Sequence, residues 1–318
     1  MRFLDYFCDE EIKVMGTNKS TSKNMLFAHI GALISVTAWG VSFVSTKVLL
    51  GNGLGPAEKY IYRFTLAYLM LLIACHKRIL SNSIRDEFLF MGCGLCAGSI
   101  YFIAENMALE YTFVTNVSLL VTTSPLITTL LMWMIYKNVK PGKGTIIGSI
   151  IAFVGVACVI FYSSFVVKLN PIGDILSILA AVSWSIYSLV LKKLNAMYSV
   201  MFISRKTFFY GVLTALPFML FQPELSSPTV LLRTEVWSNL LFLGAFASML
   251  AYILWAQSVK HLGTIKASNY MYISPVITLI ASVALLGEKL SIIGGIGCAL
   301  ILGGMWLGEY LERKQSNN

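Results

Sequence analysis

Charged residues are scarce in this 318-residue chain, in which Asp, Glu, Lys and Arg together make up 12%. Soluble globular proteins carry about 25% charged residues, because their surface faces water. Apolar residues, counted with Tyr and Cys, reach 57%. The composition excludes a water-soluble enzyme and indicates that lipid surrounds most of the chain. With about 20 apolar residues for each spanning helix, the length allows about ten spans and no separate soluble domain.

Metal-binding and nucleotide-binding patterns are also missing. The three histidines lie at the ends of apolar runs, which favours a loop or interface role over a proton relay. Cys93 and Cys96 form a close pair inside an apolar run, with no second pair and no histidine near them, so we interpret them as small packing residues. The glycine-rich segment 51–59 follows an apolar helix rather than a strand, which excludes a phosphate-binding loop. We therefore predict no cofactor, no metal and no enzyme activity.

Ten apolar runs are separated by charged or Pro/Gly-rich breaks. Each is about long enough to cross the hydrocarbon core, and the first is too long for a signal-peptide core. The pattern predicts an all-α integral membrane fold, with polar tails at 1–24 and 309–318. The predicted spans are 26–49, 58–75, 88–109, 113–136, 144–163, 172–194, 206–222, 237–259, 264–286 and 290–308.

The distribution of basic residues predicts the orientation. Most of the 24 lysines and arginines fall on one side if the spans alternate, and that side is normally cytoplasmic. Arg205 and Lys206 count with the inner residues, and Lys59 and Arg63 with the outer ones. Both termini are then cytoplasmic in an inner (plasma) membrane. The net charge of +9 is explained by loops that face anionic lipid, so the partner is the bilayer and not nucleic acid.

The chain contains an internal duplication. A shift of 150 residues superposes Gly94 on Gly244 and Ala97 on Ala247, and it also superposes the two Ser-Pro dipeptides at 124–125 and 274–275. Shorter shifts pair Trp39 with Trp184, Lys47 with Lys192 and Arg63 with Arg205. Each copy, 25–166 and 167–308, holds five predicted spans. Because five is odd, the second copy must enter the membrane from the opposite side, so we predict two inverted five-helix repeats.

Several of these segments together resemble a known family. They are WGVSFVSTK at 39–47, the two Ser-Pro dipeptides, and LGEKLSIIGGIGCALILGG at 286–304. They resemble the EamA-type members of the drug/metabolite transporter superfamily. The resemblance implies ten helices in two inverted repeats, a central cavity, and export of amino acids or related small metabolites. One departure is Asn138, which stands where the second repeat has Glu288.

Ionisable residues at membrane depth are candidates for function, because they are costly there unless they face a partner or water. Lys47 and Glu105 lie at similar predicted depth near the outer ends of their spans. They could form an ion pair that lines the outward vestibule, or Glu105 could bind an ammonium group or a proton. The alternatives are snorkelling for Lys47 and a structural pair or buried neutral acid for Glu105. Asn106 points about 100° away from Glu105 and lines the cavity or bonds a neighbouring helix.

Aromatic and amide side chains complete the predicted cavity. Trp39 and Trp184 lie near mid-membrane and either line the substrate path or pack as core residues. Pro125 and Pro275 each free a carbonyl, which a ligand could use or which could simply accompany a bend. The remaining cavity candidates are Ser42, Asn116, Thr123, Tyr187, Asn269 and Tyr272.

Three functions are compatible with this architecture. The leading hypothesis is a secondary carrier that works by alternating access, with proton coupling left open. An exchanger of anionic phosphorylated or nucleotide-linked sugars would need several cavity-facing cations, for which Lys47, Lys192 and Lys266 are the candidates. A membrane enzyme or receptor should show clustered catalytic residues or a soluble domain. Three GxxxG pairs, at 94/98, 144/148 and 304/308, permit close helix packing within a monomer or across a homodimer.

Overall fold

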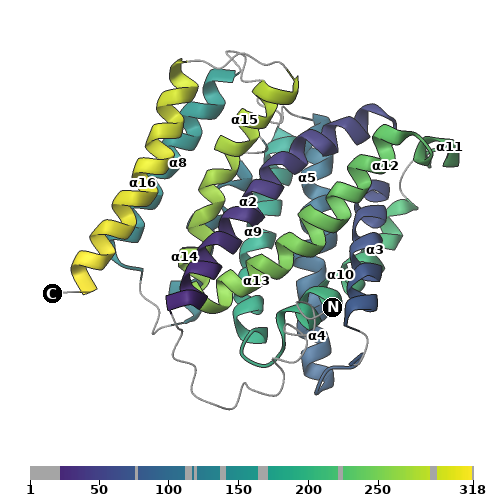
Figure 1. Ribbon diagram of the computed structural model, residues 1–318, viewed down its shortest axis with the longest axis horizontal. Helices are drawn as coiled ribbons and strands as arrows, with labels where there is room; N and C mark the ends of the chain where they lie inside the picture. Colours follow the sequence, from purple (N-terminus) through teal and green to yellow (C-terminus); the bar gives the residue numbers. More distant parts are fainter. Residues whose placement is uncertain are drawn as a thin grey trace. The chain divides into compact units, whose positions relative to one another are not determined.

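The computed structural model describes residues 22–75, 78–111, 117, 120–136, 141–163, 171–220, 225–286 and 292–316. Within these ranges the regular elements are helices (Figure 1). The chain divides into two compact units. Unit 1 takes the described parts of 1–103 and 187–264, and unit 2 takes those of 104–186 and 265–318. Each unit therefore draws helices from both predicted repeats.

Unit 1 is built from long helices that run beside one another. In it α2 packs against α13, and α3 packs against α10 (Figure 1). Two helix starts have side-chain caps, in which the hydroxyls of Ser83 and Ser199 accept backbone N–H bonds of the first turn. The elements wholly in this unit are α2 (Ser22–Gly51), α3 (Pro56–Ala74), α4 (Ile84–Gly94), η2 (Leu95–Ser99), α10 (Val200–Met219), α11 (Pro228–Leu231), α12 (Thr234–Leu241), η3 (Phe242–Leu250) and α13 (Ala251–Leu262).

Unit 2 is organised around two helices in backbone contact, α8 (Lys143–Ser163) and α16 (Ile292–Ser316) (Figure 1). A Cβ atom added at Gly148 would lie 2.6 Å from the carbonyl oxygen of Gly304, and one at Gly155 would lie 2.6 Å from the nitrogen of Ile301. The glycine pairs of the fifth and tenth predicted spans thus pack on each other within the chain. The unit also holds α7 (Ser124–Ile135), η4 (Tyr270–Ile273) and α15 (Ser274–Leu286).

Three helices contain a boundary between the units, so that each contributes residues to both. They are α5 (Ile100–Tyr111), α9 (Pro171–Leu194) and α14 (Thr264–Asn269). Both Ser-Pro dipeptides begin a new helix. Ser124 opens α7 with Pro125 in its first turn, and the 3₁₀ turn η4 precedes Ser274. The predicted irregularity at the prolines is therefore present, as a break and restart of the helix.

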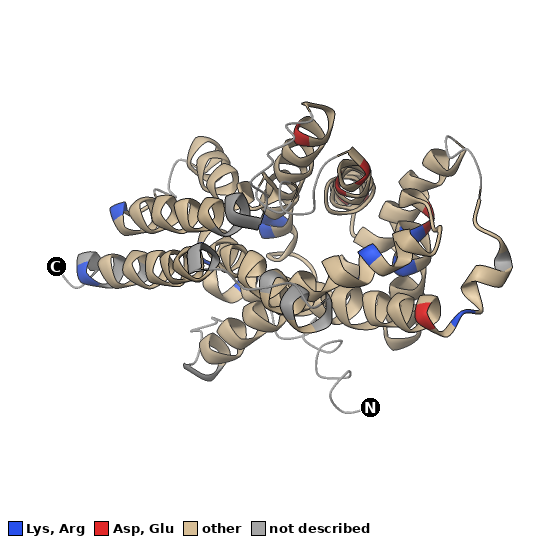
Figure 2. Cartoon of the chain, turned by 90° about the horizontal axis from the view of Figure 1, so that it is seen from above, with Lys and Arg blue, Asp and Glu red and all other residues tan. Residues whose placement is uncertain are grey.

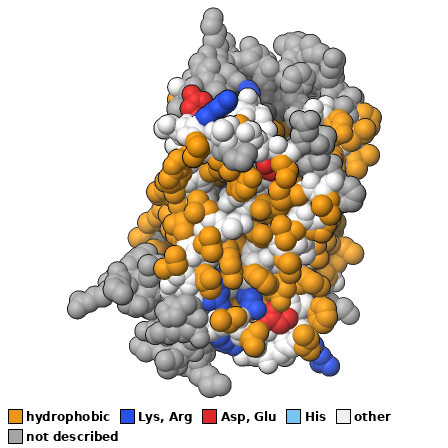
Figure 3. Space-filling model, turned by 90° about the vertical axis from the view of Figure 1, so that its right-hand side faces the viewer, with side chains coloured by type: hydrophobic (Ala, Val, Ile, Leu, Met, Phe, Trp, Pro, Cys, Tyr) orange, Lys and Arg blue, Asp and Glu red, His pale blue; other side chains and the backbone are white. Residues whose placement is uncertain are grey.

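Four continuous helices in the described ranges are long and apolar enough to cross a membrane. They are Asn24–Gly51, Ile84–Tyr111, Pro171–Leu194 and Thr234–Leu262. Shorter apolar helices lie at Ser124–Ile135, Lys143–Cys158 and Gly295–Gly308. Charged residues are sparse along the helices (Figure 2). On the face drawn in Figure 3, hydrophobic side chains cover the middle and charged ones gather toward the two ends.

The start of α10 differs from the prediction. The predicted span began at 206, but the helix begins at Val200 because Ser199 caps it. Arg205 and Lys206 therefore lie in the first two turns of α10 and not in the connection before it, and both are buried. The helix α3 likewise contains buried Glu58, Lys59 and Arg63. In carrying buried charged residues, α3 and α10 differ in composition from the four long apolar helices.

Candidate functional site

Aromatic side chains meet in the interior of unit 1. Neighbouring rings lie 4.6 to 6.3 Å apart between centroids, in tilted or edge-to-face arrangements. Tyr252 is the hub, because it contacts Trp39, Phe64, Tyr187 and Phe208. We call this group the aromatic cluster, and its members are Trp39, Tyr60, Phe64, Phe102, Tyr187, Phe208, Tyr252 and Trp255.

A buried arginine lies against this cluster. Arg63 is 4% exposed, and its guanidinium carbon lies 5.1 Å from the ring centroid of Phe64 and 4.9 Å from that of Phe102. Its Nε donates to the hydroxyl of Ser248 at 2.5 Å, and Nη2 donates to the carbonyl of Ala247 at 3.1 Å. Both the ring faces and the hydrogen bonds stabilise the cation at a depth where an unsatisfied charge would be very costly. The α3 helix thus carries a fixed positive charge into an apolar interior.

Unit 1 contains two π-helical segments, and one of them, η3, includes the Ala247 and Ser248 that bind this arginine. In η2 the N–H of Ile100 donates to the carbonyl of Leu95, five residues earlier. At the end of η3 the N–H of Ala251 donates to the carbonyls of Phe246 and Ser248. A π-helical turn displaces the regular bonding pattern, and such turns are frequent at functional sites.

Side chains from other helices bind carbonyls of both π-helical segments. The carbonyl of Ala247 accepts Trp39 Nε1–H at 2.9 Å in addition to Arg63. The carbonyl of Ala97 accepts the hydroxyl of Tyr252 at 2.8 Å. Ala97 and Ala247 are a pair that the shift of 150 residues superposes. The same irregularity, with the same kind of side-chain partner, therefore occurs at corresponding places in the two halves of the sequence.

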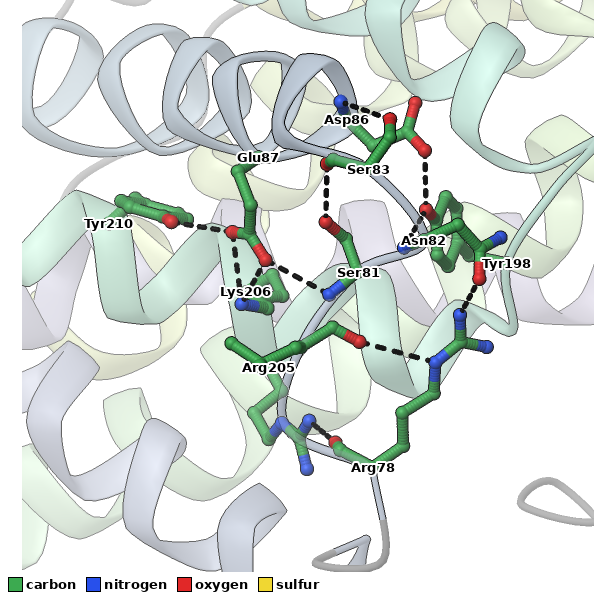
Figure 4. A network of polar contacts seen from close by, with 11 residues as sticks. Arg78, Ser81, Asn82, Ser83, Asp86, Glu87, Tyr198, Arg205, Lys206 and Tyr210 are labelled. Atoms are coloured by element: carbon green, nitrogen blue, oxygen red, sulfur yellow. Dashed lines mark hydrogen bonds and ion pairs between the residues drawn. The ribbon is translucent and has the colours of Figure 1, made fainter.

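A charged network closes one end of unit 1 (Figure 4). The carboxylate of Glu87 in α4 accepts Lys206 Nζ at 2.8 and 3.0 Å, the hydroxyl of Tyr210 at 2.5 Å and the N–H of Ser81 at 3.0 Å. We call these four residues the Glu87 network. It joins α4 to α10, which come from different halves of the sequence. Its charge-assisted bonds are stronger than neutral ones.

Two further contacts tie the same end together. Arg205 donates to the carbonyls of Cys75 and Arg78, just after α3. Tyr198, in the connection before α10, donates to Asp86 Oδ2 at 2.6 Å (Figure 4). Burial and the bond to Asp86 raise the pKa of Tyr198 above its ordinary value.

The opposite end of α3 is held by a buried carboxylate. Glu58 is 0% exposed and accepts the backbone N–H of Ser226 at 3.1 Å and its hydroxyl at 2.8 Å. It also accepts the hydroxyl of Tyr62 and the N–H of Gly55. Because Ser226 follows α10 in the chain, α3 and α10 are tied near both of their ends. Arg63 lies between the two ties.

Four predicted cavity residues lie in unit 1. Trp39 and Tyr187 both contact Tyr252, with ring centroids 5.8 and 6.3 Å away. The structure therefore brings these two into one aromatic cluster. Ser42 donates to the carbonyl of Trp39 on its own helix at 2.7 Å, and Lys47 is exposed.

The acidic and amide candidates lie in unit 2, together with the second tryptophan of the repeat. Glu105 and Asn106 on α5 are 7% and 4% exposed, and Trp184 on α9 is buried. Thr123 donates to the carbonyl of Leu120 at 2.6 Å, just before α7. Asn116 lies outside the described residues.

The last two candidates face α8. Asn269 Oδ1 accepts the hydroxyl of Ser149 at 3.5 Å. Tyr272 is fully buried in a core cluster with Ala152 and Val156 of α8. The expectation that Asn269 and Tyr272 share a face agrees with these contacts. Asn138 and Glu288 lie outside the described residues.

Sequence reasoning does not identify Arg63 as a site residue, although the sequence contains a signal for it. Arg63 interrupts an otherwise apolar span, and the duplication pairs it with Arg205. A charge repeated at equivalent membrane positions in both halves is a functional-site pattern by default. Tyr252 and Ser248 gave no comparable signal, because a tyrosine and a serine in an apolar helix are common.

The family of the chain follows from its match to known proteins. The model of the EamA-like transporter family matches residues 26–161 and again residues 171–308. The chain belongs to this family and is an integral membrane protein of the transporter class. The predicted family resemblance is confirmed.

Relatives of similar length come from bacteria and archaea. An uncharacterized transporter of Archaeoglobus fulgidus is 27% identical over 288 residues, which is 88% of this chain and 96% of the relative. The uncharacterized transporter YetK of Bacillus subtilis is 26% identical over 309 residues, 92% of this chain and 89% of the relative. A solved crystal structure that is 19% identical superposes with a TM-score of 0.74 and covers 93% of this chain and 99% of its own, which shows a shared fold.

Proposed function

We propose that this chain is a secondary-active transporter that exports amino acids or related small metabolites by alternating access. The observation that carries the proposal is the Arg63 guanidinium, which is buried among aromatic rings in the interior of unit 1. A cation at this depth is costly and is retained where it serves a solute pathway. Arginine binds carboxylates well, and the surrounding rings favour an apolar side chain.

The proposed substrate contacts are the candidates from the sequence, to which we add Arg63. They come from both halves of the chain, as expected for a site at the interface of two inverted repeats. The set is Trp39, Ser42, Lys47, Glu105, Asn106, Asn116, Thr123, Trp184, Tyr187, Asn269 and Tyr272. Glu105 is proposed to bind the ammonium group of the solute or a coupled proton. Both termini are proposed to be cytoplasmic in the inner membrane.

Reconstitution tests the proposal directly. Liposomes that contain the purified protein and are loaded with a single amino acid or related metabolite should release at least one of these solutes faster than protein-free liposomes with the same load. Glu105→Gln should change the flux or its dependence on pH, whereas Glu110→Gln, an exposed glutamate on the same helix, should not. Absence of flux for every amino acid and related metabolite would refute the substrate class.

The exchange of anionic phosphorylated solutes is a second candidate. The structure favours it more than the sequence did, because Lys59 and Arg63 are both buried in α3. Counterflow separates the two functions. A phosphorylated sugar on the outer side should accelerate release of a labelled phosphorylated sugar if the chain is an exchanger, and an external amino acid should then have no effect.

A further inference from the structure

The π-helical segments η2 and η3 are related by the duplication and lie inside two of the four long apolar helices. They stand between α4 and α5 and between α12 and α13. Gly98, inside η2, has backbone angles of φ −115° and ψ −106°, which are not helical. A long helix normally bends where its hydrogen-bond ladder is interrupted, and π-helical turns are one such interruption.

Each segment is held by side chains that come from elsewhere in the chain. Trp39 on α2 and Arg63 on α3 bind the carbonyl of Ala247, and Tyr252 on α13 binds the carbonyl of Ala97. A backbone carbonyl in an apolar interior needs a partner, because water is not there to supply one. In the π-helical form that the structure shows, these three side chains supply such partners.

The segments also lie at close helix crossings, where a glycine lets the neighbouring helix approach. A Cβ added at Gly94 would lie 2.6 Å from the nitrogen of Gly211 on α10, and one added at Gly244 would lie 2.7 Å from the side chain of Leu66 on α3. Gly94 and Gly244 correspond under the duplication. Each segment thus crosses a helix of the other half of the sequence.

We propose that η2 and η3 are paired hinges that change between π-helical and α-helical form, and that Trp39, Arg63 and Tyr252 are positioning residues that set this equilibrium. Shortening or lengthening a turn by one residue rotates everything beyond it by about 100°. In alternating access, such rotations at equivalent places in the two halves would open one side as they close the other. The proposal rests on the alternating access proposed above, and its structural part is tested independently of transport.

The experiment measures hydrogen–deuterium exchange of the protein in lipid nanodiscs. Tyr252→Phe deletes only the hydroxyl that binds the carbonyl of Ala97. Trp39→Phe deletes the indole N–H that binds the carbonyl of Ala247 and also makes the ring smaller. Tyr198→Phe is the matched control, because it also deletes one hydroxyl that donates a hydrogen bond, here to Asp86 at the start of α4 and outside both segments.

Tyr252→Phe should raise the exchange rate of amides in 95–103 about fivefold to tenfold, and Trp39→Phe should do the same in 242–250. Tyr198→Phe should leave both segments unchanged. Equal exchange in wild type and both test variants would overturn the proposal, and so would faster exchange spread over the whole unit. Arg63→Lys should resemble Trp39→Phe, and if it fails to fold the two phenylalanine variants still decide.

Transport supplies the second measurement. If the segments are hinges, Tyr252→Phe should change the maximal flux by about fivefold while KM stays within about twofold, since a shift between conformations alters the cycle more than the contacts with solute. Altered exchange with unaltered maximal flux would overturn the positioning role. If wild-type protein carries no solute at all, the proposed function fails and the exchange data alone decide whether the segments are hinges.

Discussion

Removing the negative charge of the Glu87 network should destabilise unit 1 strongly. The perturbation is Glu87→Gln, which keeps the size of the side chain. In the structure the carboxylate accepts both contacts of Lys206 Nζ, at 2.8 and 3.0 Å, and the side chains of Lys206 and Glu87 are 8% and 16% exposed. The substitution therefore leaves an ammonium group with little water and no full counter-charge at that position.

The expected magnitude follows from this burial. Breaking a fully buried ion pair by removing one partner costs about 3–5 kcal/mol, and the partial exposure here lowers the expected loss to about 2–4 kcal/mol. Since each kcal/mol shifts the unfolding temperature of a larger chain by about 2 °C, we expect a fall of about 4–8 °C. Thermal unfolding of detergent-purified protein, followed by tryptophan fluorescence, measures it.

A double variant separates the ion pair from general disturbance. Lys206→Met removes the ammonium group, so Glu87→Gln combined with Lys206→Met should be more stable than the sum of the single effects predicts by about 1–3 kcal/mol. Glu110→Gln, on the exposed surface of the same continuous helix, should leave the unfolding temperature unchanged. An unfolding temperature for Glu87→Gln equal to that of wild type would refute the reasoning.

Three other substitutions test the remaining contacts by the same thermal assay. Gly211→Ala should cost about 1–3 kcal/mol because its new Cβ meets the hydroxyl of Tyr60, and adding Tyr60→Phe should recover at least half of that loss; no recovery would mean that another atom is responsible. Gly148→Ala should be at least as damaging, since its Cβ meets the backbone of Gly304, and a stable variant would contradict the backbone contact of α8 and α16. Glu58→Gln should lower stability by about 1–3 kcal/mol through loss of a buried carboxylate that accepts the N–H and hydroxyl of Ser226, and unchanged stability would argue against this tie.

Much of the helical fold could be predicted from the apolar runs. The expected spans at 58–75 and 172–194 agree closely with α3 and α9, because each run ends at a charged or Pro/Gly-rich break that also ends the helix. The seventh span was placed too late, since hydropathy alone ignores the cap at Ser199. Apolarity locates the part of a helix that contacts lipid and gives no information on polar turns that belong to the same helix.

The π-helical segments could not be predicted. Leu95–Ser99 and Phe242–Leu250 have the same apolar composition as an ordinary spanning helix, and nothing in their periodicity separates a five-residue from a four-residue hydrogen-bond pattern. The sequence also does not reveal which side chains bind these segments, because Arg63 and its partner Ser248 are 185 positions apart in the chain. The duplication shows that Gly94 and Gly244 occupy corresponding positions in the two halves, but it gives no information on the backbone geometry beside them.

The candidate site remains a prediction, but part of its surroundings is now described. Trp39 and Tyr187 are predicted cavity residues, and the structure places both against Tyr252. Arg63 is not among the cavity residues predicted from the sequence, where it appears only as an outer basic residue that the duplication pairs with Arg205. Its burial depends on Ser248 and Ala247, which the order of helices along the chain does not bring near it, so a sequence argument lacked the partner that makes a buried arginine tolerable.

The charges of α3 have a consequence for biosynthesis. An arginine near the centre of an inserting helix costs about 2.5–3.5 kcal/mol on translocon scales, so Arg63 makes Pro56–Ala74 a poor substrate for insertion by itself. The Arg63 partners Ser248 and Ala247 are made only after some 180 more residues have left the ribosome. The segment must therefore wait at the translocon or at the lipid interface until η3 arrives, and truncated chains that end before residue 242 should be degraded by membrane quality control.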